Sequence, residues 1–157
     1  MQTKLKTLLI YIAIPLLVGG TAALLTRNSM ETFQTLNKPP LAPPGFLFPI
    51  VWTILYVLMG IASYLIASSQ KNQEDIQNAL TIYALQLAIN FLWPIFFFRL
   101  EWYLFSFFWI LLLWIFILNT IRLFYPINKT AAYLMIPYLI WVTFASYLNL
   151  FIFILNR

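Results

Sequence analysis

Two residue types that carry much of enzyme chemistry are missing, since the 157-residue chain contains neither cysteine nor histidine. Their absence excludes disulfides, thiol nucleophiles, zinc–thiolate sites and haem iron held by His or Cys. Charge is also scarce: 8% of the residues are charged, against about 25% in a typical soluble domain. With 63% hydrophobic residues, the chain has too little polar surface to coat a water-soluble globule. The composition therefore predicts a membrane protein.

Long hydrophobic runs, in contrast, fill most of the chain. A helix rises about 1.5 Å per residue and the hydrocarbon core is about 30 Å thick, so a span needs about 20 apolar residues. We predict an all-α fold with one domain, residues 1–157, that is a single bundle of five transmembrane helices. The first run, which follows Lys4 and Lys6, is long for a signal peptide, and we interpret it as a span. The expected spans are residues 5–25, 46–67, 76–98, 103–124 and 130–155.

The few charges lie mainly between the expected spans. The nine basic residues are scattered and form no patch, so we expect no nucleic-acid partner. They divide five to four between the two sides of the membrane, which leaves the orientation open. All four acidic residues lie in connectors. The spans therefore lack the buried carboxylates that ion-coupled transporters commonly use, and we expect no metal site.

The connector after the first span is rich in proline. We expect residues 30–36 to form a short amphipathic helix on the surface. Pro39, Pro40, Pro43 and Pro44 then fix the backbone φ angle, as in a stiff linker or a lid over one end of the bundle, and both interpretations stay open. Two further prolines, Pro94 and Pro137, are predicted to kink the third and fifth spans.

The spans themselves carry aromatic and amide side chains. Tyr and Trp favour membrane interfaces, which accounts for Tyr11, Trp102, Tyr103 and Tyr125. Other aromatics fall at helical spacing and share a face with small or polar residues. These stripes are Trp52, Tyr56 and Gly60 in the second span, Gln86, Asn90, Trp93 and Phe97 in the third, and Tyr138, Trp141, Ala145, Leu148 and Asn149 in the fifth.

Mid-span amides are costly in lipid, so we expect them to face inward. Asn119 and Asn149 fit hydrogen bonds between helices, whereas Asn90, beside Trp93, fits either that role or ligand binding. No Ser or Thr has a base nearby in the membrane, and conventional acid–base or hydrolytic catalysis is not expected. Indole rings stack on flat macrocycles and are oxidisable, which leaves a light-driven or radical reaction of a bound pigment open.

Three long motifs occur in order along the chain. They are Lys38-Pro39 with Pro43-Pro44 and Phe48-Pro49-x-Val51-Trp52-x-x-Leu55-Tyr56-x-x-Met59-Gly60; Ile89-Asn90-x-x-Trp93 with Phe96-Phe97-Phe98; and Pro137-Tyr138-x-x-Trp141-x-x-Phe144-Ala145-x-x-Leu148-Asn149. Together they resemble the TspO/translocator-protein family, the tryptophan-rich sensory proteins or peripheral-type benzodiazepine receptors. We interpret the chain as a bacterial member.

The resemblance implies a five-helix bundle, often a homodimer, with a pocket beneath the first long loop. Such a pocket takes porphyrins such as protoporphyrin IX, haem and isoquinoline carboxamides as ligands, and no cofactor is required. By match, Trp52 and Trp141 are the tryptophans to which porphyrin chemistry, and hence a catalytic role, is assigned. The predicted ligand-binding residues are Trp52, Tyr56, Asn90, Trp93, Tyr138, Trp141, Ala145, Leu148, Pro43 and Pro44.

Departures from the family pattern limit these expectations. Leu41 stands where a loop tryptophan is usual, and Pro94 follows Trp93 in place of a small polar residue. The C-terminal run lacks the tyrosine of the proposed cholesterol motif, and we do not predict sterol binding. We expect a multi-pass protein of a bacterial inner membrane that binds porphyrin in a sensory, regulatory or tetrapyrrole-handling role. Light- and oxygen-dependent degradation of protoporphyrin IX, porphyrin transport and a ligand-free scaffold are the alternatives.

Overall fold

The computed structural model describes residues 2–157, and within that range it is helical, without strands. Five of its segments are long and apolar enough to cross a membrane. The predicted all-α fold with five transmembrane helices is therefore confirmed. The helices are α1 (Gln2–Thr26), α2 (Met30–Thr35), α3 (Leu47–Ala67), α4 (Gln73–Pro94), α5 (Tyr103–Phe124), α6 (Lys129–Leu134) and α7 (Ile136–Asn156).

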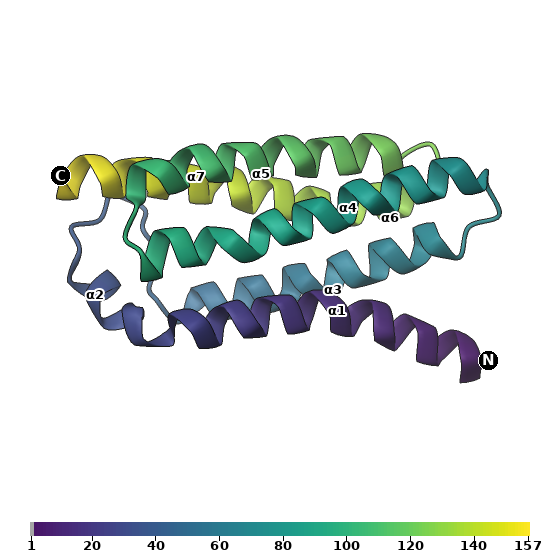
Figure 1. Ribbon diagram of the computed structural model, residues 1–157, viewed down its shortest axis with the longest axis horizontal. Coiled ribbons are helices and arrows are strands. Elements are labelled where there is room, and N and C mark those ends of the chain that lie inside the picture. Colours follow the sequence, from purple (N-terminus) through teal and green to yellow (C-terminus); the bar gives the residue numbers. More distant parts are fainter. Residues whose placement is uncertain (1) are drawn as a thin grey trace.

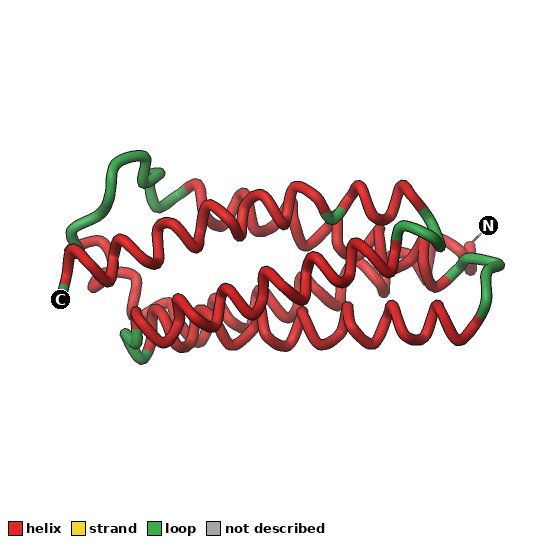
Figure 2. Tube along the Cα trace, turned by 90° about the horizontal axis from the view of Figure 1, so that it is seen from above, coloured by secondary structure: helices red, strands yellow, loops and turns green. Residues whose placement is uncertain are grey.

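The long helices form one bundle whose two chain ends lie at opposite ends, as an odd number of spans requires (Figure 1). Helix α1 packs mainly on α3, and α5 packs between α4 and α7. Short α2 lies across the end of the bundle that also holds the C-terminus (Figure 1). The connector of residues 36–46 lies at that same end and bulges out to the side of the bundle (Figure 2).

Prolines interrupt two of the long helices. After Pro94, α4 continues as a π-helical turn, Ile95–Arg99, in which the Leu100 amide donates to the Ile95 carbonyl at 2.9 Å. The fifth span is divided at Met135 into α6 and α7, two residues before Pro137. Both breaks follow from the missing N–H of proline, which leaves one carbonyl of the preceding turn without its helical partner.

A glycine sets the close packing of α1 on α3. A side-chain carbon at Gly60 would overlap the Cα atom of Ile12 and lie 2.8 Å from the Tyr11 carbonyl oxygen. Only hydrogen fits there, so the two backbones meet. In lipid, where packing between helices replaces the hydrophobic drive, small residues commonly allow this approach.

A buried hydrogen-bond chain joins three helices of the bundle. Tyr56 of α3 donates to the Asn90 side-chain oxygen of α4 at 2.7 Å. The Asn90 amide donates to the Tyr138 hydroxyl of α7, and that hydroxyl donates to Gln86, each at 2.7 Å. All four side chains are buried, so the chain satisfies polar groups that lipid could not.

One expected inward amide lies outside this arrangement. Asn119 was expected to face a neighbouring helix, and that expectation is wrong, because its side chain is exposed on α5. Asn119 lies five residues before the helix ends at Phe124 and three before Arg122. A polar side chain so close to the helix end reaches the interface and needs no helix partner.

Candidate ligand-binding cavity

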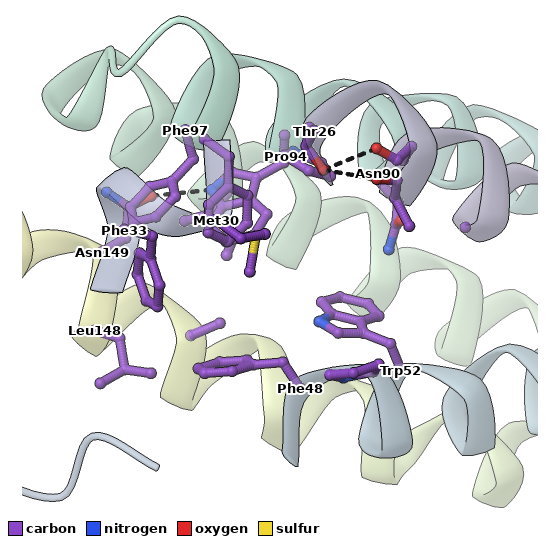
Figure 3. A pocket seen from close by; sticks show the side chains of 18 of the residues that line it. Thr26, Met30, Phe33, Phe48, Trp52, Asn90, Pro94, Phe97, Leu148 and Asn149 are labelled. Carbon is purple, nitrogen blue, oxygen red and sulfur yellow. Dashed lines mark hydrogen bonds between the residues drawn. The ribbon is translucent and has the colours of Figure 1, made fainter. Parts of the chain in front are cut away.

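A cavity of about 320 Å³ lies inside the bundle near its C-terminal end. Helices α1, α3, α4, α5 and α7 supply its walls, and α2 covers the end (Figure 3). Its lining is predominantly apolar and includes no acidic side chain. The lining residues are Gly19, Ala22, Ala23, Thr26, Arg27, Met30, Phe33, Phe48, Pro49, Trp52, Tyr56, Asn90, Trp93, Pro94, Phe97, Phe98, Ile110, Leu113, Trp141, Ala145, Leu148, Asn149 and Ile152.

One wall is an aromatic stripe on α3. Phe48, Trp52 and Tyr56 follow at intervals of four residues and therefore share a face of the helix. The Trp52 ring stacks on Tyr56, with centroids 5.5 Å apart and planes at 28°. Phe48 meets Trp141 of α7 edge-on at 5.8 Å. The two indoles are thus held by neighbouring rings on adjacent sides of the cavity.

The opposite wall is built by the end of α4 and its π-helical turn. Trp93 stacks on Phe97, with centroids 5.0 Å apart and planes at 22°. The Trp93 indole N–H donates to the Asn149 side-chain oxygen at 3.0 Å. Asn149 in turn donates to the Tyr103 carbonyl at 2.8 Å. Asn149 therefore joins α7 to α4 and α5, as the sequence predicted. It also orients the Trp93 indole, which the sequence did not predict.

The end of the cavity is closed by α2 and not by the proline loop. Phe33 is 7% exposed. Its ring centroid lies 6.2, 6.0 and 5.2 Å from those of Phe48, Phe97 and Phe98, respectively. Met30 points into the space opposite Trp52 (Figure 3). The expected short helix is present. We expected it to lie on the surface, whereas its apolar side covers the end of the cavity.

The proline loop is fastened to the C-terminal helix. The Asn37 backbone and the Asn156 side chain exchange two hydrogen bonds, at 2.9 and 2.8 Å. The Tyr147 hydroxyl donates to the Pro40 carbonyl at 2.8 Å. At its tip, Leu41 is 82% exposed and has a φ of 73°, a left-handed conformation that is unfavourable for a branched side chain.

Polar groups at the cavity are few, and most are already bonded. Thr26 donates to the Ala22 carbonyl at 2.9 Å, and Asn90 uses both ends of its amide in the buried chain. The Trp141 indole N–H is different, because it is buried and has no partner among residues 2–157. Arg27 lies exposed at the rim. The cavity lining therefore presents one cation, Arg27, at its edge, whereas the Trp141 N–H is enclosed by protein atoms.

Most of the predicted ligand-binding residues meet at this cavity. The structure places Trp52, Tyr56, Asn90, Trp93, Trp141, Ala145 and Leu148 at its lining. Tyr138 is fully buried and is not at the lining, since its hydroxyl supports Asn90 from behind. Pro43 and Pro44 do not line the cavity either. Residues of α2 cover the end of the cavity that we expected the proline loop to cover.

Several lining residues were missed from the sequence. Phe48 lies one helical turn before Trp52, so extending the stripe backwards would have found it. Phe33 and Met30 lie on one side of the short amphipathic segment, which was a usable signal. Arg27 carried no signal, because a lone basic residue at the end of a span ordinarily only marks the membrane surface.

The chemistry available here is recognition of a flat apolar molecule. No group of His, Cys, Asp or Glu that could hold a metal ion exists within residues 2–157. No carboxylate or imidazole faces the cavity to act as a general acid or base. Indole and phenyl rings at the lining favour stacking on a flat ligand.

Comparisons with known proteins agree with the architecture. The model of the TspO/MBR family matches residues 11–155. The chain is 38% identical to "Tryptophan-rich protein TspO" of Chlorobaculum tepidum, over 99% of both chains. It is 39% identical to the protein of that name from Archaeoglobus fulgidus, over 90% of this chain and 91% of the relative. "Translocator protein 2" of Canis lupus familiaris is 35% identical over 85% of this chain and 80% of its own length.

Proposed function

Because the chain belongs to the TspO/MBR family and encloses an aromatic cavity within five membrane-spanning helices, we propose that it binds a porphyrin there. The role is sensory, regulatory or in the handling of tetrapyrroles. The observation that carries the proposal is the placement of Trp52 and Trp141 together at the lining of an apolar space.

The shape and polarity of the cavity support a flat, mainly apolar ligand. Its volume of about 320 Å³ lies at the lower end of the range of about 300–1,000 Å³ for small-molecule sites. A tetrapyrrole macrocycle therefore fills it and extends past the rim. Arg27 stands at that rim and is suited to a propionate carboxylate. An isoquinoline carboxamide, which is also flat and mainly apolar, would stack on the same rings.

A dark titration with protoporphyrin IX tests the proposal. We expect saturable quenching of tryptophan fluorescence in the purified protein in detergent. Trp52→Phe and Trp141→Phe should weaken binding, and Ala145→Phe, which fills the cavity, should abolish it. Trp102→Phe is the matched control, because Trp102 is 51% exposed and lies outside the cavity. Linear quenching that all the variants share would show detergent partitioning and would defeat the proposal.

Light- and oxygen-dependent degradation of bound protoporphyrin IX is the second candidate. It is favoured by the placement of two oxidisable indoles at the cavity, with Trp52 stacked on Tyr56. In this reaction light excites the porphyrin and molecular oxygen is the oxidant. Illuminated protein should bleach the porphyrin absorption faster than detergent alone, and Trp52→Phe and Trp141→Phe should slow the loss. Equal rates with and without protein would remove this candidate.

Transport of porphyrin is a weaker third candidate. It predicts uptake of protoporphyrin IX into sealed proteoliposomes that Ala145→Phe blocks. A scaffold without a ligand predicts no saturable binding at all.

We further propose a homodimer in the inner membrane of a bacterium, which cross-linking in native membranes followed by fractionation would test.

A further inference from the structure

A methionine lies among the rings of the aromatic cavity. Met30 begins α2, and its side chain is half-buried and points into the space opposite Trp52 (Figure 3). Phe33 follows three residues later, so both side chains share the side of α2 that covers the cavity. Met59 and Met135, in contrast, are fully buried and do not line the cavity. Within residues 2–157, Met30 is therefore the one methionine that a ligand in the cavity would meet.

A porphyrin bound in the cavity would be a source of oxidant beside Met30. A porphyrin excited by light passes its energy to molecular oxygen and forms singlet oxygen, which attacks electron-rich thioethers and indoles. The chain has no cysteine or histidine to compete for this oxidant. The Met30 thioether lines the space in which the oxidant forms, whereas close packing shields Met59 and Met135 from it.

From this placement, and resting on the proposed binding of porphyrin, we infer that Met30 is a site of light-dependent oxidation that limits how long the ligand stays bound. Thioether, singlet oxygen and one water give sulfoxide and hydrogen peroxide. An S–O bond forms and the sulfur loses two electrons, while dioxygen gains two electrons and two protons. Water reaches the cavity at its rim, where Arg27 is exposed. The porphyrin only transfers energy and is not consumed in this step.

Oxidation of Met30 acts on the ligand through polarity. The sulfoxide is polar where the thioether is apolar, and the face of an aromatic macrocycle offers its oxygen no hydrogen-bond donor. Helix α2 keeps its place, because Phe33 still packs against the rings of Phe48, Phe97 and Phe98. The oxidised protein therefore holds porphyrin less well. Binding becomes self-limiting in light, and Met30 responds to pigment, light and oxygen together.

Peptide mapping by mass spectrometry tests the oxidation. The protein in lipid nanodiscs is loaded with protoporphyrin IX in the dark and then illuminated in air. We expect one oxygen atom added at Met30, little addition at Met59 or Met135, and none in the dark or under argon. Ala145→Phe, which keeps porphyrin out of the cavity, should lower the oxidation of Met30. Saturable dark binding without oxidation of Met30 overturns the inference and leaves the proposed function standing, whereas the absence of dark binding defeats both.

The rate of porphyrin release tests the consequence. Illuminated protein is reloaded with fresh protoporphyrin IX in the dark, and its release is compared with that of protein kept in the dark. We expect release about fivefold faster after illumination, as for one acceptor left unpaired. Methionine sulfoxide reductase should reverse the change. Met30→Leu, which has no sulfur, should show no acceleration by light, and Met135→Leu should show all of it. Acceleration that Met30→Leu shares, or that the reductase does not reverse, would assign the effect to the indoles and overturn the inference.

Discussion

The neighbouring glycines of α1 provide a sharp test of the cavity wall, because their environments differ completely. A side-chain carbon added at Gly19 would overlap the Tyr56 ring and lie 2.7 Å from its Cδ2 and Cζ atoms, whereas a carbon at Gly20 meets nothing within 4 Å. We therefore predict effects of opposite sign for Gly19→Ala and Gly20→Ala. The chemical change is identical, so helix propensity contributes equally to both variants.

The magnitude follows from two opposing contributions. Replacing glycine by alanine within a helix stabilises it by about 0.5–1 kcal/mol. At Gly19 the Tyr56 ring must also move, although its hydroxyl is bonded to Asn90 at 2.7 Å and its face is stacked on Trp52. Overpacking of this kind costs about 1–3 kcal/mol. We expect Gly20→Ala to be slightly stabilising and Gly19→Ala to be destabilising by about 1–2 kcal/mol.

Thermal unfolding in detergent measures this difference, and porphyrin titration measures its effect on the site. Displacement of Tyr56 also displaces Trp52, so Gly19→Ala should weaken binding while Gly20→Ala leaves it unchanged. Equal stability of the two variants would refute the reasoning, because it would mean that Tyr56 is free to move. Reduced stability with unchanged binding would separate the packing of α1 from the geometry of the cavity.

Three further changes probe the bundle and its cover. Tyr138→Phe removes the acceptor of the Asn90 side-chain N–H and the donor to the Gln86 side-chain oxygen, and should lower the free energy of unfolding by about 1–3 kcal/mol, as measured by denaturant titration. The same change at Tyr147, which is half-buried and donates to the Pro40 carbonyl, should cost less than about 1 kcal/mol. Gly60→Leu should separate α1 from α3 and lower the yield of folded protein on size-exclusion chromatography, and a normal elution profile would contradict the close packing. Phe33→Ala should open the end of the cavity and speed porphyrin release in stopped-flow measurements, with a loss of stability of about 3–5 kcal/mol.

The sequence predicted the transmembrane helices well because hydrophobic length is a one-dimensional property. Each expected span overlaps a helical segment that is long and apolar enough to cross a membrane. The division of the fifth span at Met135 was harder to predict from the sequence. Pro137 predicted a kink, but whether proline bends a helix or ends it depends on packing against neighbouring helices, which no local pattern contains.

The candidate site was predicted best where its residues repeat along one helix. Trp52 and Tyr56, or Trp141 and Ala145, share a face through spacing alone, and the structure places all four at the cavity. The residues that cover the end of the cavity were harder to predict, because their position depends on how the connector between α1 and α3 folds back onto the bundle. Prolines made residues 43 and 44 conspicuous, whereas Phe33, in a less notable segment, is the residue that packs against three cavity rings.

The buried amides show why polar residues within a membrane do not by themselves mark a ligand site. Gln86, Asn90 and Asn149 are each engaged by another side chain of the bundle, and removing any one would take a hydrogen bond from that side chain. What remains for a ligand is mainly stacking surface. A site with so little polar recognition discriminates by shape and flatness more than by functional groups. It should therefore accept several flat apolar molecules with similar affinity, which suits sensing or handling a class of pigments better than selecting one substrate among close analogues.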